Sequence, residues 1–356
     1  MNRVGFRTTG SVLVRYGDTV VLGSTQVSSR PVQLDYFPLS IDYEEKFYAA
    51  GKISGSRFIK REGRPSDEAV LIGRLIDRPI RPLFPKGYRQ EIQVVATVLS
   101  MDPGFRPDVI AMIAASSALM LTGTPFDGPV AGLRVGRVNG EFKAFLTPEE
   151  REQSDLDLVV AGIESGRTMV EAGAKEVSED VIVDAMAWAH QMMQPAIALQ
   201  RELAEKVSPT QQEYDLILPD ESIQQTVNAW ADGKFGDKIR RPYPERNEMI
   251  SEIRAEFHEA MAEKLGLDEE EYSEVRGDYD EAFTLALHKD VRRGIVAERV
   301  RPDGRQLTEI RPLSSEVGFL PRAHGSSLFT RGVTQGMNIV TLAPLSYSQL
   351  IDTMEI

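Results

Sequence analysis

The first part of the chain alternates apolar and polar residues in a way that predicts β-strands. Residues 10–29 hold two runs of β-branched residues on either side of Gly17-Asp18, a pattern typical of two strands joined by a tight turn. The polar, glycine-rich stretch 44–66 shows no sustained apolar period and is predicted to be a loop. Further extended segments are predicted at 34–43, 91–100, 129–138 and 155–162.

Helical periodicity appears between these strands. Residues 67–78 carry apolar side chains at helical spacing after Ser66, and Pro79 and Pro82 are predicted to end this helix. Two more helices are predicted, at 107–122 and at 178–206. The combination of strand pairs and helices indicates an α/β or α+β fold.

The pattern changes in the second part of the chain. Residues 207–219 are predicted to be a linker, and residues 220–293 contain no convincing strand but much Glu, Ala, Leu and Arg. This composition predicts a small acidic helical domain, and residues 299–312 mark a second boundary. Short helices are expected between glycine and proline breaks at 233–236, 242–244 and 266.

A possible internal repeat relates the two ends of the chain. Gly10–Thr19 and Gly325–Thr334 share five of ten positions, although two unrelated hairpins can also agree by chance because Gly and Thr are common in turns and strands. A true repeat would mean two copies of one fold, cut at different points. The chain would then be truncated at both ends.

Composition narrows the class of protein. The chain has 356 residues, of which 42% are apolar and 27% charged, and this rules out a mostly disordered chain and suggests two or three domains. The absence of cysteine excludes disulfides, thiolate metal sites and cysteine nucleophiles. The four histidines form no zinc-binding pattern. No signal peptide or membrane span is predicted, so a cytoplasmic location fits.

Charge is unevenly distributed along the sequence. The net charge is −13, yet residues 52–89 carry 10 bases and 4 acids, while residues 201–300 carry 14 bases and 24 acids. A local basic patch on an acidic chain can still bind a polyanion, because salt screens charges beyond about 10 Å at 0.1 M. The alternative for this patch is a solvated basic face.

The stretch 51–64, GKISGSRFIKREGR, combines flexible glycines, several cations and one aromatic ring at Phe58. Cations that follow a backbone and an aromatic platform for a base are what sequence-independent binding of a single strand needs. Arg74, Arg78 and Arg81 follow at spacings of four and three and so share one helical side. Alternatively, Arg78 forms an ion pair with Asp77 or Glu68.

Three long motifs resemble the polynucleotide phosphorylase family. They read FIKREGRPSDEAVLIGRLIDRPIRPLFPKGY, FPLSIDYEEKFYAAGKI before it, and RPDGRQLTEIRP with LPRAHGSSLFTRGVTQ near the end. The resemblance covers nearly the whole chain and is weakest across 208–290. It implies an α/β (α+β) RNase PH-like core with a ribosomal-protein-like βαβ fold at 1–207, an all-α domain at 208–296, and the beginning of a second, truncated core at 297–356.

The resemblance also implies an activity. Members of this family form ring-shaped homotrimers that thread single-stranded RNA through a central pore. They cleave its 3′ end with inorganic phosphate in the presence of Mg²⁺, release nucleoside diphosphates, and can run in reverse. RNA-degradation machinery is an expected partner. Nothing in this sequence corresponds to the family's KH and OB-type modules.

The catalytic and metal-binding residues are expected outside this chain, because the family's site lies in the second core. There a serine-rich loop, two Asp and a Lys hold phosphate and metal. In the first core, Asp157 matches one Asp, but Arg151 and Val159 stand in place of the other Asp and the Lys, and residues 106–108 replace the serines. The first core is therefore expected to be chemically degenerate, with Asp157 a strand-end carboxylate.

The RNA-guiding residues are expected in the first core. By resemblance, Phe58, Lys60, Arg61 and Arg64 line the pore constriction, and Arg74 and Arg78 are either RNA contacts or structural ion pairs. Lys60 stands where many relatives have Arg, so the charge is kept without the forked geometry of guanidinium. His324 lies in a family motif and is expected to be structural. The alternative to an enzyme is a non-catalytic RNA-binding or assembly subunit that uses the same loop.

Overall fold

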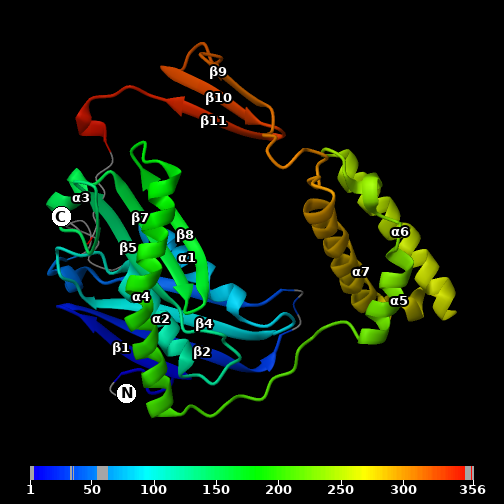
Figure 1. Cartoon of the computed structure of the whole chain (residues 1–356), viewed down its shortest axis with the longest axis horizontal. Coiled ribbons are helices and arrows are strands. Elements are labelled where there is room, and N and C mark those ends of the chain that lie inside the picture. The colour runs from blue at the N-terminus through cyan, green and yellow to red at the C-terminus, as the bar shows by residue number, and fades with distance from the viewer. Residues whose placement is uncertain (1–3, 33, 35, 54–62, 349–353, 355–356) are drawn as a thin grey trace. The chain divides into compact units, whose positions relative to one another are not determined.

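The computed structural model describes residues 4–32, 34, 36–53, 63–348 and 354. These residues form two compact units: the first runs to Ile217 and includes Met354, and the second begins at Leu218 (Figure 1). No helix among these residues is long and apolar enough to span a bilayer.

The first unit contains two four-stranded sheets. The first is antiparallel except that its last two strands run parallel, and the second is antiparallel throughout. In sheet order, the strands of the first are β1 (Gly10–Tyr16), β2 (Thr19–Pro31), β4 (Gln90–Ser100) and β3 (Leu39–Glu45). Those of the second are β6 (Glu141–Ala144), β5 (Ala131–Val138), β7 (Leu156–Ile163) and β8 (Gly166–Ala174).

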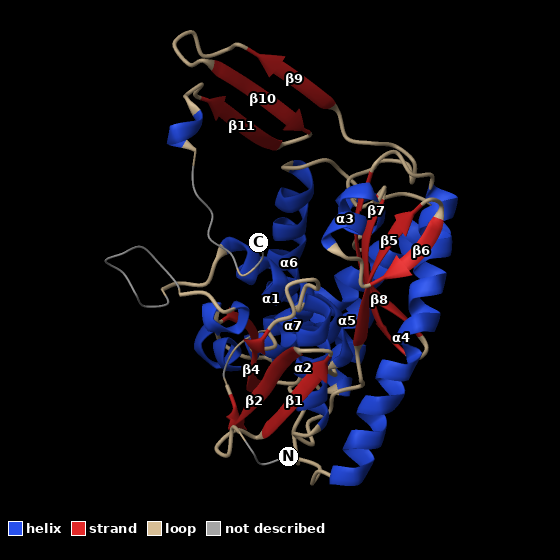
Figure 2. Ribbon diagram, turned by 90° about the vertical axis from the view of Figure 1, so that its left-hand side faces the viewer, coloured by secondary structure: helices blue, strands red, loops and turns tan. Residues whose placement is uncertain are grey.

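Helix α2 (Asp108–Met120) joins the two sheets into one core. It is apolar on all sides, which is typical of a helix that is buried all round, and it contacts strands of both sheets. The approach to the first sheet is close, because a Cβ atom on Gly10 or Gly23 would overlap the carbonyl oxygen of Ala118 or Ala114. Figure 2 shows α2 beside β1, β2 and β4.

The other helices of the first unit cover the outer faces and edges. They are α1 (Asp67–Ile80), α3 (Pro148–Gln153) and α4 (Glu179–Val207). Helix α4 packs on β5 and β7 through a stripe of small and apolar residues that includes Ala185, Ala189 and Met193. Helix α1 contacts β3, and a Cβ on Gly73 would lie 3.1 Å from the carbonyl oxygen of Ile41.

The predicted hairpin, strands and three helices of the first unit are confirmed, but one predicted helix end is wrong. Pro79 lies inside α1, which ends at Ile80 and continues into a 3₁₀ turn at Arg81–Leu83. A proline in the last helical turn removes only one backbone hydrogen bond, and both Pro79 and Ile80 are buried in the core. The predicted loop 44–66 also contains a 3₁₀ turn at Phe47–Ala50.

The second unit contains the helices α5 (Glu221–Ala231), α6 (Glu245–Leu265) and α7 (Glu269–Ala297) and a three-stranded sheet. The helices pack around the aromatic pair Phe257 and Phe283, whose ring centroids are 5.0 Å apart. The expectation of short helices is wrong for α6 and α7, which have 21 and 29 residues. Gly266 ends α6 in the left-handed conformation, but Gly277 lies within α7 without interrupting it.

The sheet of the second unit repeats the geometry of the first hairpin. Its strands are β9 (Leu313–Val317), β10 (Gly325–Arg331) and β11 (Thr334–Val340), in the order β11-β10-β9. Arg331 pairs with Thr334 across a turn in which Gly332 has φ 61°, just as Tyr16 pairs with Thr19 across Gly17 with φ 59°. Both hairpins pair seven positions across equal turns, which supports the interpretation of these segments as copies of one hairpin.

The close approach of α2 to β2 predicts that one added methyl group at Gly23 lowers the stability of the first unit substantially. We expect Gly23→Ala to lower the free energy of unfolding of the first unit by at least about 1–3 kcal/mol, because the backbone of α2 cannot move without opening both sheets. Gly173→Ala is the matched control, since a Cβ there meets nothing within 4 Å. Urea unfolding followed by Trp188 in a Trp230→Phe background measures both, and equal stability of the two variants would contradict the argument.

A buried histidine predicts pH-dependent stability of the helices in the second unit. Burial lowers the pKa of His258, whose ring nitrogens lie 2.8 Å from the Tyr272 hydroxyl and 3.1 Å from an Asp280 carboxylate oxygen. The unfolded chain therefore takes up a proton more readily than the folded one, and stability falls as the pH drops through about 6.5.

The test is urea unfolding at several pH values, followed by Trp230 in a Trp188→Phe background. We expect His258→Gln to flatten the pH dependence around that pH, whereas His288→Gln, at an exposed position of α7, should leave it unchanged. An identical slope in the parent and in His258→Gln would show that His258 does not titrate differently on folding.

Candidate functional site

Helix α1 carries Arg74 and Arg78 of the basic region, Arg64 precedes the helix, and Arg81 follows it. Its start is fixed by Ser66, whose hydroxyl oxygen accepts a hydrogen bond from the backbone N–H of Ala69 at 3.0 Å. Its inner face is buried through residues that include Leu75 and Ile76. The outer face is therefore held in place independently of its charged side chains. Phe58, Lys60 and Arg61 lie outside the described residues.

The arginines of this region differ in what they contact. Arg64 and Arg74 are exposed, and in the part of the chain that the structure describes neither makes a hydrogen bond or an ion pair. Arg78 is also exposed, and its Nη1 lies 3.0 Å from an oxygen of Glu171 in β8. The predicted alternative of a pair between Arg78 and Asp77 or Glu68 is wrong, because the partner of Arg78 is Glu171, which lies in a strand of the second sheet.

Asp77 is instead the partner of Arg81. The guanidinium of Arg81 contacts both carboxylate oxygens, at 2.9 and 2.6 Å, and also donates to the backbone carbonyls of Phe37 and Leu39. These contacts bind the end of α1 to the beginning of β3. Arg81 therefore stabilises the fold, whereas Arg64 and Arg74 leave their full charge available to a ligand.

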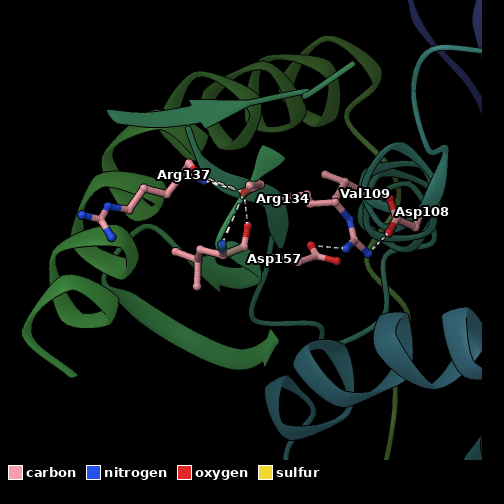
Figure 3. A network of polar contacts seen from close by, with 7 residues as sticks. Asp108, Val109, Arg134, Arg137 and Asp157 are labelled. Carbon is pink, nitrogen blue, oxygen red and sulfur yellow. Dashed lines mark hydrogen bonds and ion pairs between the residues drawn. The ribbon is translucent and has the colours of Figure 1, made fainter. Parts of the chain in front are cut away.

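A second candidate is a cavity of about 340 Å³ where the beginning of α2 meets the second sheet. Its walls combine apolar side chains with acidic and basic ones. Figure 3 shows the polar contacts among Asp108, Arg134 and Asp157. Residues that line it include Phe105, Arg106, Asp108, Arg134, Phe145, Arg151, Asp155, Asp157 and Lys175.

Arg134 of β5 lines this cavity and is the residue at which two of its ion pairs meet. Its Nη2 lies 2.6 Å from Asp108, which is 2% exposed, and its Nη1 contacts Asp157, which is 59% exposed. Burial alone would lower the pKa of Arg134, but the two carboxylates outweigh that effect and raise it. Figure 3 shows the guanidinium between the two carboxylates. Next to this group, Arg137 pairs with Asp155 at 3.0 Å.

The carboxylates of the cavity do not fit a divalent cation. Asp157, the residue that matches a metal-binding Asp, is held by a guanidinium, as is Asp108. Across the described ranges, no group of three or more acidic or histidine side chains could hold a metal ion. Val159 is buried in the core, so nothing replaces the missing lysine at that position. Both carboxylates beside Arg134 are thus engaged in ion pairs, whereas the Nε atom of Arg134 and one oxygen of Asp155 are buried without a hydrogen-bond partner among the described residues.

Sequence reasoning did not find this network. One sequence signal for a buried polar site was present, because Arg134 interrupts the apolar run of β5. However, the residues that pair with Arg134 lie 26 positions before and 23 positions after it. Sequence spacing cannot predict a contact between residues so far apart in the chain. Only the packing of α2 against β5, and the pairing of β5 with β7, bring the three residues together.

The comparisons with known proteins agree with this architecture. Residues 3–125 match the model of the 3′ exoribonuclease family, domain 1, and residues 128–192 match domain 2 of that family. The chain is 45% identical over 348 residues to a polyribonucleotide nucleotidyltransferase of Geobacillus kaustophilus, covering 98% of this chain and 47% of that protein. It is 47% identical over 345 residues to the protein of the same name from Staphylococcus carnosus, covering 96% and 49%.

The chain thus spans about half the length of the curated relatives it matches. Among solved structures, that of Rrp46 from rice (Oryza sativa) is similar, with 14% sequence identity and a TM-score of 0.47, covering 57% of this chain and 91% of that chain.

The two carboxylates of Arg134 predict unequal effects on stability. We expect Asp108→Ala to cost about 3–5 kcal/mol of unfolding free energy, because it leaves a largely buried cation without its buried partner. Asp157→Ala removes an exposed partner of the same guanidinium and should cost less than about 1 kcal/mol. Urea unfolding of the first unit measures both. Equal losses would mean that burial of Asp108 does not determine the strength of the pair.

Proposed function

We propose that this chain, which belongs to the 3′ exoribonuclease family with its RNase PH-type domains, is the amino-terminal part of a polyribonucleotide nucleotidyltransferase. The reaction of the whole protein is phosphorolysis of single-stranded RNA from its 3′ end. An oxygen of inorganic phosphate bonds to the phosphorus of the terminal phosphodiester. The bond from that phosphorus to the 3′ oxygen of the preceding nucleotide breaks, and a nucleoside diphosphate leaves. In the reverse direction the protein extends an RNA 3′ end.

The observation that carries the role of this chain is the charged outer face of α1 together with Arg64, which precedes the helix. Arg64 and Arg74 are exposed and have no partner within the described ranges, and Arg78 is one helical turn, or roughly 6 Å, beyond Arg74. Such a row can follow successive phosphates of an extended strand without reading base edges. We therefore assign single-stranded RNA binding to this face, together with Phe58, Lys60 and Arg61.

We place the phosphorolytic chemistry outside the cavity at Arg134. Its carboxylates Asp108 and Asp157 are both held by the guanidinium of Arg134, so no step that needs Mg²⁺ is assigned to it. The family context favours Mg²⁺ and inorganic phosphate in another part of the full-length protein. A homotrimer, contact with RNA-degradation machinery and a cytoplasmic location belong to the same proposal.

Because Arg134 already holds both of its neighbouring carboxylates, a second candidate is that this chain is a non-catalytic RNA-binding or assembly subunit. The two candidates share the RNA-binding face and differ in one measurable product. Release of nucleoside diphosphate from RNA by the full-length protein, dependent on inorganic phosphate, is expected for the enzyme and would exclude the subunit.

Binding of a labelled single-stranded RNA over a salt series tests the RNA-binding face. We expect the double variant Arg64→Gln, Arg74→Gln to bind more weakly, with a salt slope smaller by about 1.4, since each lost phosphate contact on a single strand removes about 0.7. The control is Arg201→Gln, which removes an exposed guanidinium of α4 that already pairs with Glu164. Fluorescence anisotropy gives both quantities.

Two outcomes would overturn the assignment: a parent chain that does not bind RNA, or an equal affinity and slope in the parent and the double variant. Changing the base composition of the RNA should have little effect, because stacking and backbone charge do not read base edges.

A further inference from the structure

The ion pair between Arg78 and Glu171 places an acid against one of the cations of the basic face. Arg78 and Arg74 lie on the same side of α1, yet only Arg78 has a partner among the described residues. Glu171 lies in β8, 93 positions along the chain. One guanidinium nitrogen makes the contact, at 3.0 Å, so the remaining N–H groups of Arg78 are not used by this carboxylate.

This pair is too exposed to be a main support of the fold. The side chains of Arg78 and Glu171 are 51% and 61% exposed, and exposed pairs of this kind contribute little to stability. The backbones of both residues are held by other contacts. Glu171 pairs with Val159 in the β7–β8 ladder, and α1 is held by its buried face and its cap at Ser66.

The carboxylate of Glu171 offers Arg78 the same kind of acceptor as an RNA phosphate, namely anionic oxygens. Arginine binds both groups through the same N–H donors. A phosphate that reaches Arg78 must therefore replace or share this carboxylate. Arg74, with no acidic partner among the described residues, carries no such penalty.

We propose that Glu171 is a positioning residue that holds Arg78 on the surface of α1 and competes with RNA phosphate for its guanidinium. The inference rests on the proposed function of this face and adds an internal competitor to it. RNA first contacts the unpaired cations Arg64 and Arg74. It engages Arg78 in competition with Glu171, which weakens binding and reduces the gain from the third cation.

A double-mutant cycle on Arg78 and Glu171, read by RNA anisotropy over a salt series, tests the proposal. We expect Glu171→Gln, which keeps the size of the side chain and removes its charge, to tighten binding by about 1.5- to 5-fold, the range that the loss of an exposed ion pair allows. The salt slope should become steeper by up to about 0.7, because Arg78 then contributes a full phosphate contact.

The background of Arg78→Gln separates competition from a general charge effect. In that background Glu171→Gln should give no gain, because the contested guanidinium is absent. A gain of equal size in both backgrounds would show that the removed negative charge acts at long range, and it would overturn the proposal. Glu141→Gln, at an exposed position of the edge strand β6, controls for the loss of one acid elsewhere in the unit.

The failure of this inference is distinguishable from failure of the proposed function. If the parent binds RNA and loses affinity in Arg64→Gln, Arg74→Gln, but Glu171→Gln has no effect, the face binds RNA and the competition does not exist. If the parent does not bind RNA, both fail. The unfolding free energy of Glu171→Gln is measured as well. We expect it to change little while the RNA affinity changes, and this result would exclude a purely structural role for Glu171.

Discussion

The close contact of α2 with the first sheet is the constraint on which the rest of the first unit depends. At Gly10 and Gly23 there is no room for a side chain, so the backbone of α2 lies directly on β1 and β2. The opposite side of α2 then reaches the second sheet. Because this one helix is shared, the two sheets form a single core, and its first residue, Asp108, is carried to β5.

The position of Asp108 determines the chemistry of the nearby cavity. A buried carboxylate needs a partner, and Arg134 supplies it from β5. The same guanidinium also reaches Asp157, so one cation holds both carboxylates in ion pairs, although its single charge balances only one of them. The packing of the core therefore explains why this cavity is a stable ion-pair network, and why its charged residues are poor candidates for catalysis.

Much of this architecture could be predicted from the sequence, and the failures have physical causes. The hairpin at Gly17 and the buried strand β4 are confirmed because alternation and turn residues are local signals. β8 was missed because its residues are mostly exposed and show no regular alternation of apolar and polar side chains. The end of α1 was misplaced because burial of Pro79 offsets the usual effect of proline.

The partners of the arginines show the limit of sequence reasoning most clearly. Spacing suggested neighbours of Arg78 on its own helix, but Arg81 takes Asp77, since it can also bind the carbonyls at the start of β3. Arg78 therefore pairs with Glu171 of β8, and Arg74 has no partner among the described residues. Four arginines within one short segment thus have different roles, which depend on the acids and carbonyls that the tertiary fold brings to each. A charge pattern alone shows that a basic face exists, and the structure shows which of its charges are already used.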